Sequence, residues 1–336
     1  MRVKQLLFVL VLLVALCVPA LGFDASVPEN LRNAILFSWD GVQREHLIEC
    51  LSRGELPNLA ALIKEGNVAN IEVTGHQTAT KPGHVQMLTG YDPDVTGTKT
   101  NAEFKIIPKG LSVFERLEDA FGSDKIATIM ITGCSHHIGD CPPSKPEEIE
   151  KAKAELAKGD LSPDDREKRV FIIQNTNGEP FYNVTRSIDF WDGEQRRYSD
   201  INGPIMLQAV DKYGKGRFFA FFHFRDPDHE GHTFGENSEQ YTHAIIDCDK
   251  WLGEIVRKLK DLGVYDKTMV FVTSDHGFDE GKRSHSNAPQ VVLAANLKTL
   301  RKSGDQRDIT PTILAEMGVN VSKLQPKYKG VVLTAQ

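Results

Sequence analysis

Short, strongly apolar runs alternate along this chain with longer segments in which apolar residues recur at helical spacing. Runs of four to eight residues rich in β-branched and aromatic side chains are typical of buried strands, whereas apolar positions three and four apart indicate the buried face of a helix. Continuously apolar strands are typical of a sheet that is covered on both faces. The predicted strands are 34–39, 68–73, 125–132, 217–224, 268–274 and 288–295.

Helices are predicted in the segments between these strands. Several begin near a proline or a polar capping residue and end near a glycine, as helices in proteins commonly do. The predicted helices are 57–66, 82–90, 111–121, 238–263 and 309–318. The sequence therefore predicts an α/β fold with a single doubly wound, mostly parallel sheet and helices on both faces.

The stretch from about 135 to 205 departs from this alternation because it is rich in proline, glycine and charged residues. Its clearest element is an exposed helix over 145–159. We interpret the stretch as a small insertion over the sheet edge, within one domain that spans 23–336. It is either a cap over a substrate or a solvated surface segment, which is the more common role of a charge-rich helix.

Three aspartates come at or just after the end of an apolar run: Asp40, Asp228 and Asp275. Parallel strands all end at one edge of a sheet, and open α/β sheets bind their ligands in the crevice at that edge. We therefore expect these three carboxyl groups to meet in one crevice, although they are far apart in the sequence.

The first 22 residues are expected to be a secretory signal peptide. Arg2 and Lys4 precede an apolar core at 6–18, and small residues follow up to Gly22. This core is shorter than a comfortable membrane span, so no stable span is expected to remain after cleavage. The expected location is secreted or periplasmic, and an uncleaved anchor is the alternative.

The formal net charge is −6, and it becomes −8 without the first 22 residues. An acidic chain argues against a nucleic-acid-binding surface, which needs a basic footprint. A phosphate substrate remains compatible because bound metal ions can reverse the local charge. Export permits disulfides, and we expect one between Cys134 and Cys141; the pairing of Cys50 and Cys248 stays open.

Side chains that could ligate a metal ion gather in short motifs around one hydroxyl. They are Asp40 in "FSWDG", Thr80 in "TATKPGH", Asp228 and His232 in "DPDHEGH", Asp275 and His276 in "SDHGF", and His285 in "SHSNAP". Carboxylate and imidazole together suit Zn²⁺. A lone Asp or Thr is usually a cap or turn residue. Their joint occurrence, in order and at strand ends, favours a functional site.

In this order the motifs resemble the alkaline phosphatase superfamily and, within it, the nucleotide pyrophosphatase/phosphodiesterase type. The resemblance covers most of the chain and is densest over 34–104 and 217–295. It implies two metal ions, one held by Asp40, Thr80, Asp275 and His276 and the other by Asp228, His232 and His285. It also implies that Thr80 attacks phosphorus to form a phospho-threonine, and that Asn101 donates a hydrogen bond to a phosphoryl oxygen.

Other residues near these motifs receive lesser roles. Lys81 could contact an anion, His84 could face the site or line a groove, and His223 could lie behind Asp228 or touch the substrate. A helix that begins near Pro82 would aim backbone N–H groups at the developing anion. The histidines expected to be ordinary surface or core residues are His46, His136, His137 and His243.

We therefore expect a secreted two-metal phosphoric ester hydrolase, either a phosphodiesterase or a phosphatase, that acts on a small phosphate ester. The expected metal is Zn²⁺, with Mn²⁺ or a mixed pair left open. A sulfatase is the nearest alternative, but sulfatases need a Cys or Ser that becomes formylglycine, and this chain has Thr80. The other alternative is a non-catalytic binding protein with the same fold, although all the implied ligands are present.

Overall fold

The protein is described by a computed structural model over residues 33–193 and 196–334, and the expected signal peptide at 1–22 lies outside these residues. The strands are β1 (Asn33–Trp39), β2 (Asn67–Glu72), β3 (Ala127–Thr132), β4 (Phe190–Asp192), β5 (Phe218–Phe224), β6 (Thr268–Thr273), β7 (Gln290–Ala295) and β8 (Ser303–Asp305).

The helices alternate with these strands and confirm most of the helical segments predicted from the sequence. They are α1 (Arg44–Ser52), α2 (Pro57–Glu65), α3 (Thr80–Thr89), α4 (Pro93–Thr96), α5 (Val113–Phe121), α6 (Ser135–Ile138), α7 (Pro146–Lys158), α8 (Pro163–Gln174), α9 (Ser199–Tyr213), α10 (Asp226–Phe234), α11 (Glu239–Asp261) and α12 (Ile309–Glu316). None of these described helices combines the length and apolar character needed to cross a membrane.

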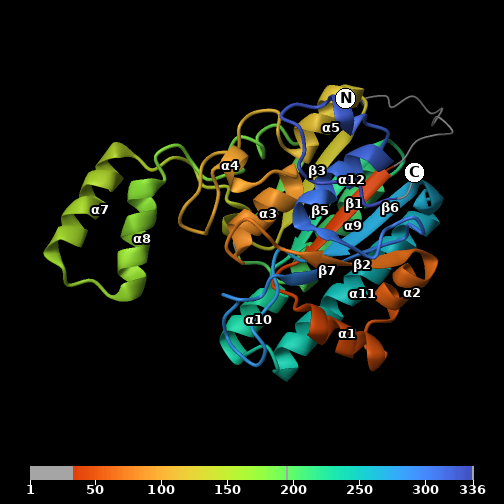
Figure 1. The fold of residues 1–336 in the computed structure, drawn as a ribbon, viewed down its shortest axis with the longest axis horizontal. Helices are drawn as coiled ribbons and strands as arrows, with labels where there is room; N and C mark the ends of the chain where they lie inside the picture. Colours follow the sequence, from red (N-terminus) through yellow and green to blue (C-terminus); the bar gives the residue numbers. More distant parts are fainter. Residues whose placement is uncertain (1–32, 194–195, 335–336) are drawn as a thin grey trace, which may run out of the picture.

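The strands form one sheet in the order β4-β3-β5-β1-β6-β7-β2-β8 (Figure 1). The first five strands in that order run parallel to one another. Strand β7 runs antiparallel to both of its neighbours, and β8 is parallel to β2. The predicted mostly parallel α/β sheet is therefore confirmed, with β7 as the exception.

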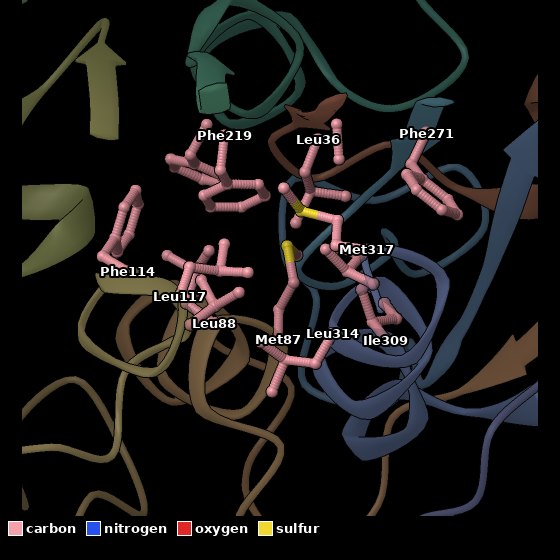
Figure 2. Packing of buried hydrophobic residues seen from close by; sticks show 14 of the residues in the cluster. Leu36, Met87, Leu88, Phe114, Leu117, Phe219, Phe271, Ile309, Leu314 and Met317 are labelled. Carbon is pink, nitrogen blue, oxygen red and sulfur yellow. The ribbon is translucent and has the colours of Figure 1, made fainter. Parts of the chain in front are cut away.

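Two hydrophobic clusters cover the two faces of this sheet. Leu36 and Phe37 are adjacent on β1 and belong to different clusters, because successive side chains of a strand point to opposite faces. One cluster packs the sheet against α3, α5 and α12, with Phe114, Phe219 and Leu314 among its members (Figure 2). The other packs it against α1, α2, α9 and α11. Helices thus lie on both faces, as the sequence predicts.

The strands β5, β1 and β6 are neighbours at the centre of the sheet and end at the same edge. Asp40 directly follows β1, and its N–H donates to the carbonyl of Phe224, the last residue of β5, at 3.0 Å. Asp228 lies in the first turn of α10, immediately after β5, and Asp275 lies two residues beyond the end of β6. The topology thus brings these three carboxyl groups to one place.

The segment 135–205 contributes both to the sheet and to a projection from it. Helices α7 and α8 pack against each other as a hairpin that stands clear of the rest of the fold, at the left of Figure 1. Strand β4 instead adds an edge strand beside β3. At the base of the hairpin, the N–H of Glu179 donates to the carbonyl of Cys141 at 3.0 Å, and Glu179 Oε2 accepts from the Cys141 N–H at 2.9 Å.

The expected disulfide between Cys134 and Cys141 is absent, since both residues are free thiols. The turn α6 separates them and gives each sulfur a histidine partner. Cys141 Sγ lies 3.1 Å from Nδ1 of His136, while the thiol of Cys134 hydrogen-bonds to His137. The short loop between the two cysteines is therefore held by polar contacts and not by a covalent bond.

Candidate active site

The seven predicted ligand residues gather at the carboxyl edge of the central strands, in two adjoining sets. The inner set is Asp40, Thr80, Asp275 and His276, and the outer set is Asp228, His232 and His285. Inner residues come from the ends of β1 and β6 and from the first turn of α3, and outer residues come from α10 and the loop before β7. The sets adjoin where the rings of His276 and His285 stack, with centroids 3.9 Å apart.

His276 is the centre of the inner set. Its Nε2 lies 3.3 Å from Thr80 Oγ1, 3.3 Å from Asp275 Oδ2 and 3.7 Å from Asp40 Oδ1. Its Nδ1 is 2.8 Å from the carbonyl of Gly277, which can only accept, so Nδ1 carries the proton in the neutral ring. Burial lowers the pKa of His276 to about 4. The lone pair on Nε2 therefore faces two carboxylates and one hydroxyl.

The outer set has the same design. Nδ1 of His232 donates to the carbonyl of Arg283 at 2.8 Å, and Nδ1 of His285 donates to the carbonyl of Thr78 at 2.7 Å. These contacts fix the tautomers, so both Nε2 atoms carry lone pairs in the neutral rings. The two Nε2 atoms are 3.2 Å apart, and Asp228 Oδ1 lies 3.3 Å from the first and 4.0 Å from the second. Lone pairs of two imidazoles and a carboxylate repel one another at these distances, so a proton or a cation is needed between them.

Each aspartate of the two sets has one buried carboxylate oxygen without a hydrogen-bond partner: Asp40 Oδ1, Asp228 Oδ1 and Asp275 Oδ2. These are the same oxygens that face the imidazole lone pairs. Burial, and then the charge of Asp275, raise the pKa of Asp40 well above its usual range. Leaving buried carboxylates unpaired is unfavourable, and a divalent cation beside each set would offset that cost. The donor atoms therefore fit two divalent cations of the Zn²⁺ type.

The second oxygen of Asp40 is held by two histidines. Asp40 Oδ2 lies 2.6 Å from Nδ1 of His137 and 2.8 Å from Nε2 of His223. Burial acts to lower the pKa of His137, but the charge and hydrogen bond of Asp40 outweigh it and raise that pKa well above its usual range. His223 therefore lies on Asp40 and not behind Asp228. The expectation of an ordinary role for His137 was wrong, because it assumed no connection between the loop after β3 and the end of β1.

The first turn of α3 is seated directly on the end of β6. Gly83 allows this approach, since a Cβ atom at this position would lie 2.5 Å from the carbonyl oxygen of Asp275. His84 is fully buried beneath the nucleophile candidate, with Nδ1 2.9 Å from the carbonyl of Thr80 and Nε2 2.9 Å from Ser38 Oγ. His84 therefore supports the inner set from below and is not positioned to line a groove.

Asn101 is tied to the start of α3. Its Oδ1 accepts from the N–H of Lys81, the residue after Thr80, at 2.9 Å, and this contact does not use the amide N–H groups of Asn101. The sequence predicts that backbone N–H groups at the start of this helix point at an anion, but in the structure these groups are used elsewhere or are missing. The N–H of Lys81 is used by Asn101, Pro82 has none, and Gly83 donates to Ala79 at 3.0 Å.

The ammonium group of Lys81 is paired and nearly buried. Its Nζ lies 2.8 Å from Glu179 Oε1 and near the rings of Phe104 and Phe171, at 5.0 and 5.1 Å from their centroids. Phe171 belongs to α8, so Lys81 joins the segment around Thr80 to the hairpin. Glu179 and Phe171 lie in no recognisable motif. Their place beside the candidate site is visible only from their contacts with Lys81 in the structure.

The sequence profile of the type I phosphodiesterase / nucleotide pyrophosphatase family matches residues 34–330, a range that contains both ligand sets. The chain belongs to this family. Type I phosphodiesterases and nucleotide pyrophosphatases are hydrolases of phosphoric ester and anhydride bonds, and membership implies dependence on divalent metal ions.

Two curated relatives of this chain are longer than the chain. The bis(5'-adenosyl)-triphosphatase enpp4 of Mus musculus is 25% identical over 310 residues, which cover 91% of this chain and 58% of that protein. The GPI ethanolamine phosphate transferase 1 of Aspergillus oryzae is 23% identical over 300 residues, which cover 83% of this chain and 26% of that protein. The chain thus spans little more than half of the first relative.

Solved structures give the same fold at lower identity. A 2-O GAG sulfatase superposes with a TM-score of 0.61 and 10% identity, over 90% of this phosphodiesterase-family chain and 73% of the sulfatase. A second structure, a protein in complex with a neocarrahexaose, has a TM-score of 0.58 and 17% identity. This likeness supports the doubly wound α/β fold and says nothing of the substrate.

Proposed function

We propose that this chain hydrolyses phosphoric esters with Thr80 as the nucleophile and with two divalent cations, of which Zn²⁺ is the first choice. The observation that carries the proposal is the convergence of the Thr80 hydroxyl and two unpartnered carboxylate oxygens, from Asp40 and Asp275, on the lone pair of His276 Nε2. Membership of the phosphodiesterase family supports the class of reaction.

The inner and outer sets would each hold one cation. Bound divalent cations supply Lewis-acid stabilisation of phosphoryl charge and favour the ionised form of a neighbouring hydroxyl. With two divalent cations against the charges of Asp40, Asp228 and Asp275, the crevice is about +1. It can therefore attract a phosphate ester although the protein as a whole is acidic.

The residues of the chain then divide the work. Thr80 Oγ1 forms a bond to phosphorus as the leaving-group oxygen departs, which gives a phospho-threonine. Asn101 is oriented by the Lys81 N–H and donates its amide hydrogens to a phosphoryl oxygen, where negative charge builds in the transition state. Water then hydrolyses the phospho-threonine on the side of the outer set and regenerates the Thr80 hydroxyl.

The expected substrate is a small phosphodiester or phosphoanhydride. The name of the mouse relative, a bis(5'-adenosyl)-triphosphatase, supports this choice over a simple monoester. Thr80 also argues against sulfatase chemistry, because a threonine side chain cannot provide the formylglycine aldehyde. We further propose that the enzyme is exported, on the strength of the first 22 residues.

The test is hydrolysis of bis-p-nitrophenyl phosphate, p-nitrophenyl phosphate and p-nitrophenyl sulfate by chelated protein, before and after addition of Zn²⁺ or Mn²⁺. We expect metal-dependent release of nitrophenol, fastest from the diester and undetectable from the sulfate. Release from the sulfate alone would contradict the proposal. Equal release by chelated and metal-loaded protein would contradict the role of the cations.

A further inference from the structure

Three potential ligands that neither set uses meet at the base of the α7–α8 hairpin. Cys141 Sγ lies 3.1 Å from Nδ1 of His136, and this nitrogen lies 4.0 Å from Glu179 Oε2. One donor atom from each residue lies within 4.8 Å of the others. A thiolate, an imidazole and a carboxylate form a ligand set for a borderline-soft cation, and three protein ligands leave a fourth position for water.

We propose that His136, Cys141 and Glu179 form a third cation site, separate from the inner and outer sets and selective for Zn²⁺ over hard cations such as Mg²⁺. Glu179 is fully buried, and its two oxygens face different ways. Oε1 is paired with Lys81 Nζ at 2.8 Å, while Oε2 accepts from the Cys141 N–H and retains a lone pair on the side of the cluster. The carboxylate can therefore keep Lys81 and bind a cation together.

A cation has a route to this site. The side chain of His136 is 45% exposed, whereas Glu179 is closed off from water, so the imidazole forms the outer wall and the carboxylate the inner one. A thiol–imidazole hydrogen bond alone would account for the 3.1 Å contact. The buried Glu179 Oε2 faces the same nitrogen at 4.0 Å and adds a third donor atom to the pair.

Cation binding here would act on the hairpin. Cys141 precedes α7 and Glu179 follows α8, so a bridge between them closes the loop 141–179 at its base. The Cys141 thiol releases its proton to water as the sulfur–metal bond forms, and no oxidation or reduction takes place. Through Glu179 and Lys81 the closed base connects to the residue next to Thr80, so the cation would steady the hairpin against the nucleophile segment.

The test is a titration of chelated protein with Co²⁺ followed by absorption spectroscopy. The inner and outer sets contain no sulfur, so a thiolate-to-cobalt charge-transfer band in the near ultraviolet reports the third site alone. We expect this band in the parent and its loss in Cys141→Ser. The matched control is Cys134→Ser in the same segment, which should keep the band. His136→Asn, with its exposed position, should lose the band even if Cys141→Ser fails to fold.

Zn²⁺ added to the cobalt-loaded protein should displace the band, and Mg²⁺ should not. Absence of the band in the folded parent, or its persistence in both Cys141→Ser and His136→Asn, would overturn the site. The hydrolysis assay is read separately, so a protein that shows the band without activity would refute the proposed function and leave the third site standing.

Discussion

The inner and outer sets carry similar ligands but are built in different ways. Asp40, Asp275 and His276 are fully buried at strand ends, whereas the His232 side chain in the outer set is 43% exposed and that of His285 is 15% exposed. The inner set lies at strand ends and on the first turn of α3, and buried histidines beside it hold its geometry. The outer set depends on α10 and on the loop before β7, and its two imidazoles are oriented by the carbonyl of Arg283 in that loop and by the carbonyl of Thr78 in the segment before α3.

This difference indicates a division of labour between the sets. A buried site whose ligand atoms are held by packing and by hydrogen bonds keeps its geometry, which suits the side that carries Thr80, the proposed nucleophile. A partly exposed site is open to water and to a departing product, which suits release of the phosphoryl group. The cation of the outer set should therefore exchange with solvent faster than that of the inner set.

The largest expected effect is that of Thr80→Ala. If Thr80 is the nucleophile, as proposed, its removal should lower kcat for bis-p-nitrophenyl phosphate by at least about 10⁴-fold, since loss of a nucleophile removes the covalent route. Thr80→Ser keeps a hydroxyl and should retain much more activity. Metal content measured by atomic emission should stay near two or three equivalents in both variants, and near-parental kcat in Thr80→Ala would contradict the role of Thr80 as nucleophile.

Removal of one imidazole from each set tests the comparison directly. His285→Ala should lower kcat/KM by at least about a hundredfold and lose one metal equivalent, with a small change in thermal stability because the side chain is partly exposed. His276→Ala should also lower the free energy of unfolding of the metal-free protein, by about 2–4 kcal/mol, because it leaves a cavity in a fully buried site. Equal loss of stability in the two variants would contradict the contrast between a buried inner set and a partly exposed outer set.

The two histidines on Asp40 give a smaller effect. His137→Asn and His223→Asn should each weaken Zn²⁺ binding by about 10–100-fold, because Asp40 would lose part of the support that turns Oδ1 toward the inner set. Competition with a chromophoric chelator measures this affinity. His243→Asn, on the exposed side of α11, is the control and should bind Zn²⁺ like the parent. Unchanged affinity in all three variants would show that the inner set does not need these histidines.

The pH dependence of the metal-free protein gives the smallest effect. Burial lowers the pKa of His84 to about 4, while an unfolded imidazole titrates near 6.5. Between these values the unfolded chain binds the proton and the folded chain does not, so stability falls as the pH is lowered through this window. In His84→Gln this component is absent. Urea titrations at pH 7 and pH 5 should show a smaller loss of unfolding free energy for the variant, and the other shifted groups, such as His276 and His285, are present in both proteins.

Much of the fold follows from the sequence because long apolar runs report burial on both faces. Strands β4 and β8 are three residues each, too short to show a period, and the polar segment of α10 gives no helical signal although Asp228 and His232 lie four apart on it. The prediction of mostly parallel strands is confirmed. No local pattern marks β7 as antiparallel, because the direction of a strand in the sheet is set by the segment that connects it to the preceding strand and not by its own residues.

The candidate ligands could be found because each follows a strand end or lies in a distinctive motif. His137 and Glu179 could not, because their importance comes from which strands and loops are neighbours in space. Strand β3 lies beside β5 in the sheet, so the loop that carries His137 reaches the same edge as Asp40. A sequence does not state the order of its strands, and contacts between loops depend on that order.

Gly83 has a consequence for how this protein can change over evolutionary time. The distance between Thr80 and the end of β6 is set by backbone packed on backbone, with room for a hydrogen atom but not for a methyl group. Any other amino acid at this position adds at least that methyl group and would move the hydroxyl away from the carboxylates. A hydrolase of this design can change many of its side chains one at a time, while the spacing between Thr80 and the end of β6 depends on a position where even a methyl group does not fit.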